Sequence, residues 1–433
     1  MTIQERLIIK NFFSVKDFDW EIRDFNILTG GMASGKSMCV KLLYFLEKIM
    51  HTLIFYQNIT KEDLEKSVFL LNIEKEFAKL FNVKGINFSE TEINYTYSYN
   101  SIVFDLKANW SGEENRLSWS SHYLNNHLQQ WQSFFENGQQ QSDKPLNTPL
   151  DKSHIVCNQI YEAISNEFGY SFPVGTMFIP ASRAIATITD NTDFPDPFIV
   201  DFIKILKRFV LRFDKLSNED INNILQVKNM KYDRNDGLRL TLLNEQVVTP
   251  LYLSSGQQEL LYMLLLIGHL DETQFTFASD SMSIFDEEPC AHLFPQEQKD
   301  SIEYIVNMYR HLKEQANTRR VRFFITTHSP YILNAINNML KKGYVNSCIQ
   351  ACTDTTLKEE LEGCMKSLSF PHLTSDEISA YFIEKNGEAA SMLSGNSADP
   401  YLYEEKIEDI SHGINEDYLS IKDLQRRCKN EEV

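Results

Sequence analysis

Hydrophobic and polar positions alternate near the N-terminus in the way that short strands do. Residues 6–15 and 17–22 have this pattern, and the apolar stretch 25–29 predicts a third, buried strand. Leucine and isoleucine recur at helical spacing over residues 36–50. We therefore expect strand, glycine-rich loop and helix in succession, and we assign them to one unit, residues 1–56.

The next part of the chain interrupts this rhythm. Residues 61–81 are charged and helical in period, residues 93–108 alternate with a period of two, and residues 123–135 predict another helix. Residues 137–153 are polar and contain glycine and proline, so we expect a loop there. We interpret residues 57–174 as an inserted α+β lobe that projects from the core.

An α/β pattern resumes after the insertion. We expect the core to continue over residues 175–345 and a C-terminal extension of helices and strands over 346–433. The strands predicted in this part are residues 176–180, 238–242, 247–253, 283–285 and 322–326, and the helices are residues 196–213, 260–267 and 295–316. The fold class is therefore α/β, with a mixed sheet and N-terminal antiparallel strands.

Composition and charge exclude several classes of protein. No apolar run approaches the roughly 18 residues of a membrane span, and the N-terminus lacks the layout of a signal peptide, so we expect a cytoplasmic protein without membrane contact. Seven scattered cysteines without a C-x-x-C pair argue against a disulfide framework and a zinc site. The net charge of −18 opposes DNA binding, which depends on Lys and Arg, although a local basic face leaves DNA as an open partner.

The glycine-rich loop has the strongest chemical signal. Residues 30–37 read Gly-Gly-Met-Ala-Ser-Gly-Lys-Ser and match G-x-x-x-x-G-K-[ST], the P-loop pattern that holds phosphates. A strand before it and a helix N-terminus after it direct backbone N–H groups at the anion. We expect Lys36 to reach the β- and γ-phosphates and Ser37 to ligate Mg²⁺. The expected phosphate-binding residues are Gly30, Gly31, Met32, Ala33, Ser34, Gly35, Lys36, Ser37 and Met38.

A second motif opens the apolar helix at 260–267. Residues 253–259 read Leu-Ser-Ser-Gly-Gln-Gln-Glu, and a serine-glycine turn at a helix N-terminus suits a phosphate. In isolation a simple N-cap would explain the serine equally well. Beside a P-loop, we expect nucleotide contacts from Ser254, Ser255, Gly256 and Gln257.

The third motif is an apolar strand that ends in three acids, Asp286, Glu287 and Glu288. This Walker B pattern supplies one carboxylate for Mg²⁺ and another that activates the attacking water. Because Glu288 precedes a proline, we expect it to be the general base and Glu287 the metal-side acid. Asp286 takes the metal role if the strand is shifted by one residue.

A fourth motif follows the last predicted core strand. Residues 326–330 read Thr-Thr-His-Ser-Pro, and His328 comes at the carboxyl end of the strand, where nucleotides bind in open α/β sheets. We expect His328 to contact the γ-phosphate and the attacking water as a catalytic residue together with Lys36 and Glu288.

The order of these motifs resembles the heads of ABC-type P-loop ATPases. It is similar to the branch that contains structural-maintenance-of-chromosomes (SMC), RecF-like and OLD-type ATPases. Within it, the Glu-Glu-Pro-x-x-His-Leu-x-Pro block at 287–295 and the Thr-His-Ser-Pro block at 327–330 resemble AAA-family ATPases of anti-phage defence systems of the PARIS, Septu and retron-associated types. Residues 179–183 and 380–385 carry further resemblance, whereas 57–174 carry none.

This resemblance implies an ATP- and Mg²⁺-dependent ATPase that works as a homodimer or higher homo-oligomer. It further implies a regulatory or sensor subunit, with an effector nuclease or toxin from the same operon as partner and a phage-encoded trigger. Two departures stand out: Met32-Ala33 replaces the usual Asn-Gly, and the acidic motif of a Toprim nuclease is absent from the residues after 328. The Q-loop glutamine cannot be assigned.

The sequence also fits other functions. The main alternative is a DNA-repair or chromosome-maintenance ATPase that grips DNA with its inserted lobe. A transporter ATPase fits less well with the insertion and with the His-Leu-x-Pro block. A module that holds ATP without hydrolysing it is a further alternative, and replacing Glu288 would test it.

Overall fold

The computed structural model describes most of the chain. The described residues are 3–55, 59–83, 86–112, 116–137, 149–173, 175–184, 195–210, 219–233, 237–268, 270, 281–289, 291–315, 320–394 and 400–403.

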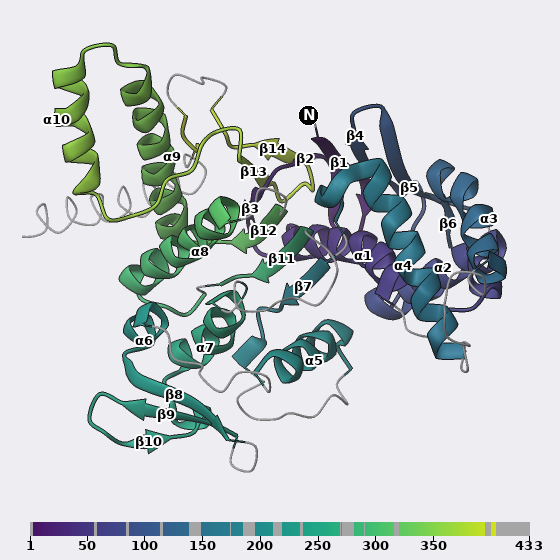
Figure 1. Cartoon of the computed structure of the whole chain (residues 1–433), viewed down its shortest axis with the longest axis horizontal. Coiled ribbons are helices and arrows are strands. Elements are labelled where there is room, and N and C mark those ends of the chain that lie inside the picture. The colour runs from purple at the N-terminus through teal and green to yellow at the C-terminus, as the bar shows by residue number, and fades with distance from the viewer. Residues whose placement is uncertain are drawn as a thin grey trace, which may run out of the picture.

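A six-stranded sheet forms the centre of the molecule (Figure 1). Five of its strands are parallel, and the sixth, β14, pairs antiparallel with β13. In spatial order they are β14 (Ala389–Ser391), β13 (Ile378–Ile383), β3 (Phe25–Gly30), β12 (Arg320–Thr327), β11 (Ser281–Glu287) and β7 (Gly175–Ile179). The predicted strands at 25–29, 176–180, 283–285 and 322–326 are thus confirmed, and β13 comes from the predicted C-terminal extension.

A second, antiparallel sheet contains both N-terminal strands and three strands of the predicted insertion. Its order is β2 (Val15–Ile22), β1 (Ile3–Phe12), β4 (Glu92–Tyr99), β5 (Ile102–Trp110) and β6 (Leu117–Ser120). β1 and β4 pair in continuous register from Ile3↔Tyr99 to Lys10↔Glu92. The sheet therefore runs across the boundary that we predicted at residue 57, and the strands of residues 57–174 extend the N-terminal sheet.

Two apolar cores lie on opposite faces of the six-stranded sheet, because alternate residues of each strand point to opposite sides. Phe285 and Phe324 belong to the core that contains the antiparallel sheet, whereas Ile284 and Ile325 belong to the other. The first core also contains α1 (Lys36–Phe55), α2 (Lys66–Phe81), α3 (His122–Asn137) and α4 (Pro149–Phe168). The second contains α6 (Glu219–Leu225), α7 (Ser255–Gly268), α8 (Pro295–Gln315) and α9 (Pro330–Ala351), and α5 (Pro197–Val210) contributes to both.

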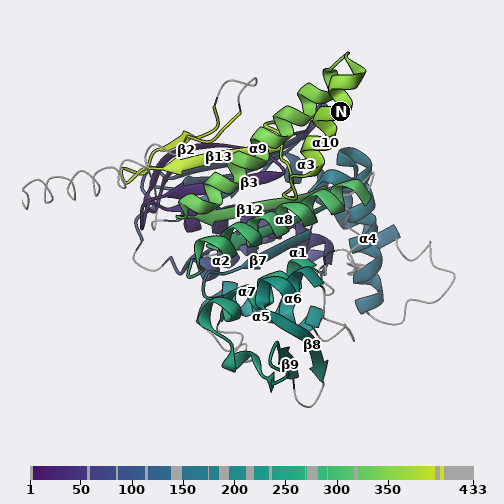
Figure 2. The same cartoon turned by 90° about the vertical axis from the view of Figure 1, so that its left-hand side faces the viewer.

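A small sheet and a helical hairpin extend to the periphery. A small sheet of β8 (Val227–Asp233), β9 (Gly237–Leu242) and β10 (Val247–Val248) is at one end of the molecule, while α9 and α10 (Thr355–Lys366) form a hairpin that extends from another side (Figure 2). Within the described residues, no helix combines the length and the apolar composition that a bilayer crossing needs.

Two element predictions need correction. The strand predicted over 247–253 ends at Val248, and a 3-10 turn, Pro250–Tyr252, replaces its second half, because Pro250 has no N–H for a strand ladder. The loop predicted over 137–153 includes the first residues of α4, which begins at Pro149. The centre of that predicted loop lies outside the described residues.

A buried ion cluster joins the antiparallel sheet, α1 and β12. Arg322 is fully buried and donates to Glu5, and its Nη2 is 3.1 Å from Glu47 Oε2. Tyr95 donates to Glu5 Oε1 at 2.7 Å, and Ser283 accepts from Arg322. Two carboxylates thus share one guanidinium in the interior.

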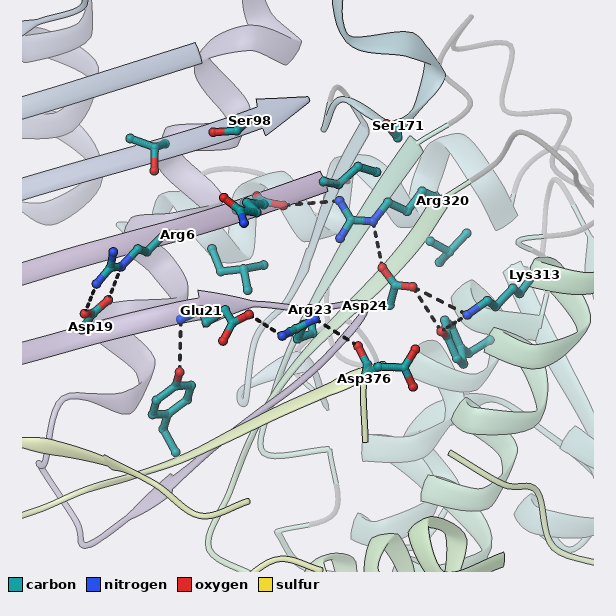
Figure 3. Close-up of a pocket in the computed structure, with 18 residues that line it drawn as sticks. Arg6, Asp19, Glu21, Arg23, Asp24, Ser98, Ser171, Lys313, Arg320 and Asp376 are labelled. Carbon is teal, nitrogen blue, oxygen red and sulfur yellow. Dashed lines mark hydrogen bonds and ion pairs between the residues drawn. The ribbon is translucent and has the colours of Figure 1, made fainter. Parts of the chain in front are cut away.

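A polar pocket of about 1100 Å³ opens at the amino ends of β3 and β12, away from the P-loop (Figure 3). Its charged side chains face one another: Arg6 pairs with Asp19, Arg23 with Glu21, and Arg320 with Asp24. Because these pairs are internally neutral, the pocket offers little net charge to a phosphate ligand.

Candidate functional site

The P-loop follows β3 directly, and its shape depends on close approaches of the backbone. A Cβ on Gly35 would lie 2.5 Å from Val15 Cγ2, and Gly35 also has φ +107°, which disfavours any other residue there. Ala33 adopts φ 59°, the left-handed region, although it carries a side chain. α1 begins at Lys36, so the loop ends at a helix N-terminus with exposed backbone N–H groups.

Lys36 lies at the centre of the site. Its side chain is buried, and Nζ donates to the carbonyls of Gly30 and Gly31, each at 3.1 Å. Nζ is also 3.1 Å from His328 Nε2. Burial lowers the pKa of Lys36, and the negative charge of Glu288 opposes this effect.

The acids of β11 point in different directions. Asp286 lies on the same face as Ile284, toward the core of α7 and α8, whereas Glu287 lies on the face of Phe285 and α1. Asp286 is fully buried with Arg183 Nη1 at 3.7 Å, and burial raises its pKa to about 7 although Arg183 lowers it. The structure therefore contradicts the placement of Asp286 beside Ser37, because one step along a strand reverses the face.

Glu287 meets the N-terminal turns of α1. The Ser37 side chain lies beside its carboxylate, and Lys41 Nζ is 3.7 Å from Oε2. Burial raises the pKa of Glu287, and Lys41 and Ser37 act in the opposite direction. A serine hydroxyl and a carboxylate thus lie together at the start of the helix.

Glu288 turns away from the strand into the loop that follows it. Its φ is 47°, and its backbone N–H donates to Thr326 O at 3.1 Å. The backbone N–H of His328 donates to Glu288 Oε2 at 3.2 Å, and His328 Nε2 is 3.2 Å from Oε1. Lys36, Glu288 and His328 therefore meet at the carboxyl ends of three neighbouring strands.

Several buried oxygens beside the P-loop have no hydrogen-bond partner among the described residues. They are Thr29 Oγ1, Ser34 Oγ and Glu287 Oε1. Unsatisfied buried oxygens are costly, and a ligand bound at this place would supply the missing contacts. Oxygen atoms are the ligands that Mg²⁺ prefers, so the residues present fit a magnesium–phosphate group.

The serine-glycine turn lies on the other side of the sheet from α1. Ser254 Oγ accepts from Gln257 N at 3.4 Å, while Gln257 Oε1 accepts from Ser254 N at 3.0 Å, so the two residues form a capping box. Ser254 and Ser255 are exposed, and a Cβ on Gly256 would lie 2.8 Å from Leu293 Cδ2.

The structure thus brings part of the predicted group of residues together. Lys36, Ser37, Glu287, Glu288 and His328 come together in one chain. Within the described part of the chain, no hydrogen bond or ion pair joins residues 254–257 or the exposed Met32 to this group.

Sequence reasoning missed four residues that surround this site. Lys41 faces Glu287. Arg183 donates to the carbonyl of Glu287 at the end of β11 and to that of Glu259 in α7, and His292 contacts the Glu259 side chain. The sequence gives little indication of the role of Arg183, because Arg183 contacts mainly backbone carbonyls, which no side-chain pattern reveals. His292 was part of the Glu-Glu-Pro-x-x-His-Leu-x-Pro block, but that block does not indicate its partner.

Comparison with solved structures gave weak similarity. An SMC head bound to the C-winged helix domain of ScpA is 13% identical, with a TM-score of 0.41, and the alignment covers 77% of this chain and 91% of that one. The SMC head domain from Thermotoga maritima is 12% identical, with a TM-score of 0.34, and the alignment covers 77% and 92%. No curated protein matched the sequence.

Comparison with protein families gave a match over most of the chain. The model of the AAA ATPase domain matches residues 1–333, which include the P-loop, the serine-glycine turn, the three acids at 286–288 and His328. Since this is more than half of the 433 residues, the chain belongs to the AAA ATPase domain family and is an ATPase with an α/β P-loop fold.

Proposed function

We propose that two copies of this chain enclose Mg-ATP, each contributing its P-loop to one site and its Ser254–Gly256 turn to the other. The observation that carries the proposal is that Lys36, Glu288 and His328 lie together in one chain. His328 Nε2 is 3.1 Å from Lys36 Nζ and 3.2 Å from Glu288 Oε1. In the same chain, the exposed serine-glycine turn starts a helix on the opposite face of the sheet. A second copy arranged head to tail would supply that turn to the nucleotide.

Each residue at the convergence has a distinct role in this proposal. Lys36 places positive charge on the β- and γ-phosphates, and the P-loop N–H groups hold their oxygens. Glu288 accepts a proton from the attacking water, and the His328 N–H keeps its carboxylate in position. Ser254, Ser255 and Gly256 of the second copy add donors to the γ-phosphate side, with Gln257 holding the turn through its capping contact.

The metal would be held by Ser37 and Glu287, whose side chains lie beside each other at the start of α1. When bound, Mg²⁺ neutralises charge on the phosphate oxygens. The free Oε1 of Glu287 gives it capacity for a further contact. Asp286 has no place in this shell, because it faces Arg183 on the opposite side of β11.

The biological role that we propose is a regulatory ATPase subunit of a bacterial anti-phage complex. The support is the resemblance of the blocks at 287–295 and 327–330 to ATPases of such systems, and the net charge of −18, which suits protein partners better than DNA. ATP binding would close the dimer and hydrolysis would reopen it, so nucleotide state would control a separate effector.

Replacing the general base tests the chemistry. Glu288→Gln should reduce kcat by roughly 100- to 10,000-fold, as general-base loss does, while ATP still binds. Lys36→Ala should weaken ATP binding by roughly 10- to 100-fold, since it removes charge-assisted contacts. The exposed Glu76→Gln serves as the matched control and should leave both values unchanged. An unchanged kcat in Glu288→Gln would show that this carboxylate is not the base.

A pair of neighbouring variants tests the metal assignment. Glu287→Gln should raise the Mg²⁺ concentration needed for half-maximal ATPase activity, because it removes a metal-side carboxylate. Asp286→Asn should leave that concentration unchanged, whatever it does to kcat. The reverse pattern would transfer the metal role to Asp286.

Assembly and partners are tested with the Glu288→Gln variant, which holds ATP. Multi-angle light scattering should show a dimer with Mg-ATP that Ser254→Arg prevents. Native purification with the neighbouring genes should recover a bound effector. Salt-dependent DNA binding and DNA-stimulated hydrolysis, with no bound protein, would instead favour a DNA-repair or chromosome-maintenance ATPase.

A further inference from the structure

A buried arginine lies between α7, which begins at the serine-glycine turn, and the end of β11. Arg183 is fully buried, and its guanidinium is 3.7 Å from Asp286 Oδ1. Its donors are directed at four backbone carbonyls: Pro180 at 3.2 Å, and Glu259, Glu287 and Glu288 at 2.9 Å each. One planar side chain thus connects α7 with the end of β11.

These contacts fix the backbone around the general base. Glu288 has a left-handed conformation, which costs a residue with a side chain about 1 to 2 kcal/mol. Thr326 accepts from its N–H on one side, and Arg183 donates to its carbonyl on the other. The direction in which the Glu288 carboxylate points therefore depends on the position of Arg183.

A second contact joins the same two elements nearer the surface. His292 Nδ1 is 2.5 Å from Glu259 Oε1, and Leu293 packs directly against Gly256. Glu259 lies three residues after Gly256, the last residue of the serine-glycine turn, and its backbone carbonyl also accepts from Arg183. The first turns of α7 are therefore held to the segment after β11 on both the buried and the exposed side.

We infer that Arg183 and His292 are positioning residues that couple the serine-glycine turn to Glu288 within one chain. The inference rests on the proposed two-chain site. When the turn of one chain contacts the nucleotide of its partner, α7 shifts by a small amount, and the rigid fork of Arg183 transmits that shift to the carbonyls of Glu287 and Glu288. Contact of the turn with the nucleotide at one site therefore positions Glu288 at the other site, and the two sites hydrolyse ATP cooperatively.

Two variants test this coupling without removing a catalytic group. Arg183→Lys keeps the positive charge beside Asp286 but loses the fork, and kcat should fall roughly 100-fold with ATP affinity unchanged, as expected for a misplaced base. His292→Gln alters a mostly exposed side chain, with 69% of its surface accessible, so folding is not at risk. This variant should bind ATP normally and lower the Hill coefficient for ATP toward 1.

Arg322→Lys provides the matched control, because Arg322 is equally buried but pairs with Glu5 and Glu47. It should lower the melting temperature and leave kcat and the Hill coefficient of the folded protein unchanged. A wild-type kcat and Hill coefficient in both Arg183→Lys and His292→Gln would overturn the coupling. A Glu288→Gln variant that stays monomeric in Mg-ATP would instead refute the two-chain site itself.

Discussion

Glu47 is expected to make the protein less stable as pH rises, and its replacement by glutamine should remove that loss. Burial raises the pKa of Glu47 from 4.5 to about 7; the positive charge of Arg322 opposes this rise, and the negative charge of Glu5 adds to it. The folded protein then binds this proton more tightly than the unfolded chain. The contribution of Glu47 to the free energy of unfolding is therefore highest below pH 4.5 and falls as pH rises toward 7.

The size of the effect follows from the two pKa values. A rise from 4.5 to about 7 corresponds to about 3 kcal/mol between the protonated and ionised forms. Glutamine resembles the protonated carboxyl, so the Glu47→Gln variant should gain stability relative to wild type as pH rises. Between pH 5 and pH 8 the difference between the two proteins should change by about 2 to 3 kcal/mol.

Urea unfolding at pH 5, 6, 7 and 8 measures this difference directly, because all other titrating groups are shared and cancel. Glu136→Gln is the control: Lys61 holds the pKa of the exposed Glu136 below its usual value, so its difference from wild type should stay flat over the same range. A flat difference for Glu47→Gln, or one that falls with pH, would show that Arg322 keeps Glu47 ionised and would refute the reasoning.

Three further substitutions, two in the P-loop and one in the core, should change stability or ATP binding. Ala33→Gly should raise the free energy of unfolding by up to about 1 kcal/mol, because Ala33 has φ 59°. A lower free energy of unfolding in chemical denaturation would show that the left-handed conformation of Ala33 does not destabilise the protein. Gly35→Ala should abolish ATP binding in a fluorescent-nucleotide titration while the protein stays folded, since its Cβ would lie 2.5 Å from Val15 Cγ2, and retained affinity would contradict this. Phe285→Ala should cost about 3 to 5 kcal/mol in urea unfolding, because the ring is fully buried and stacks on Phe324 at 4.5 Å, and a cost below about 1 kcal/mol would mean that the core refills the space.

The central strands and the P-loop were predictable because their signals are local. Residues 25–29 and 322–326 are largely apolar, as strands covered on both faces must be, and the glycine-lysine-serine loop has a fixed spacing. The short extent of β10 was also available from the sequence, since Pro250 interrupts the predicted strand.

Other features depend on which segments meet in space. The strand 92–99 looked like part of a separate lobe, because alternation identifies a strand but not its partner, and the structure pairs it with β1. The roles of Asp286 and Glu287 differ by one residue of register, and three adjacent acids do not reveal which one faces α1. Arg183 could not be assigned, because its partners are main-chain carbonyls.

The position of β13 has a consequence for synthesis on the ribosome. β3 carries the P-loop and is made near the start of translation, yet one of its two neighbours, β13, is not made until residues 378–383 emerge. Until then one edge of β3 presents unpaired backbone groups, which invite association with other nascent chains. A polypeptide stopped at residue 333, where the family match ends, would keep that open edge permanently. Nucleotide binding should therefore arise late and all at once, and shortened versions of the protein should aggregate rather than behave as minimal ATPases.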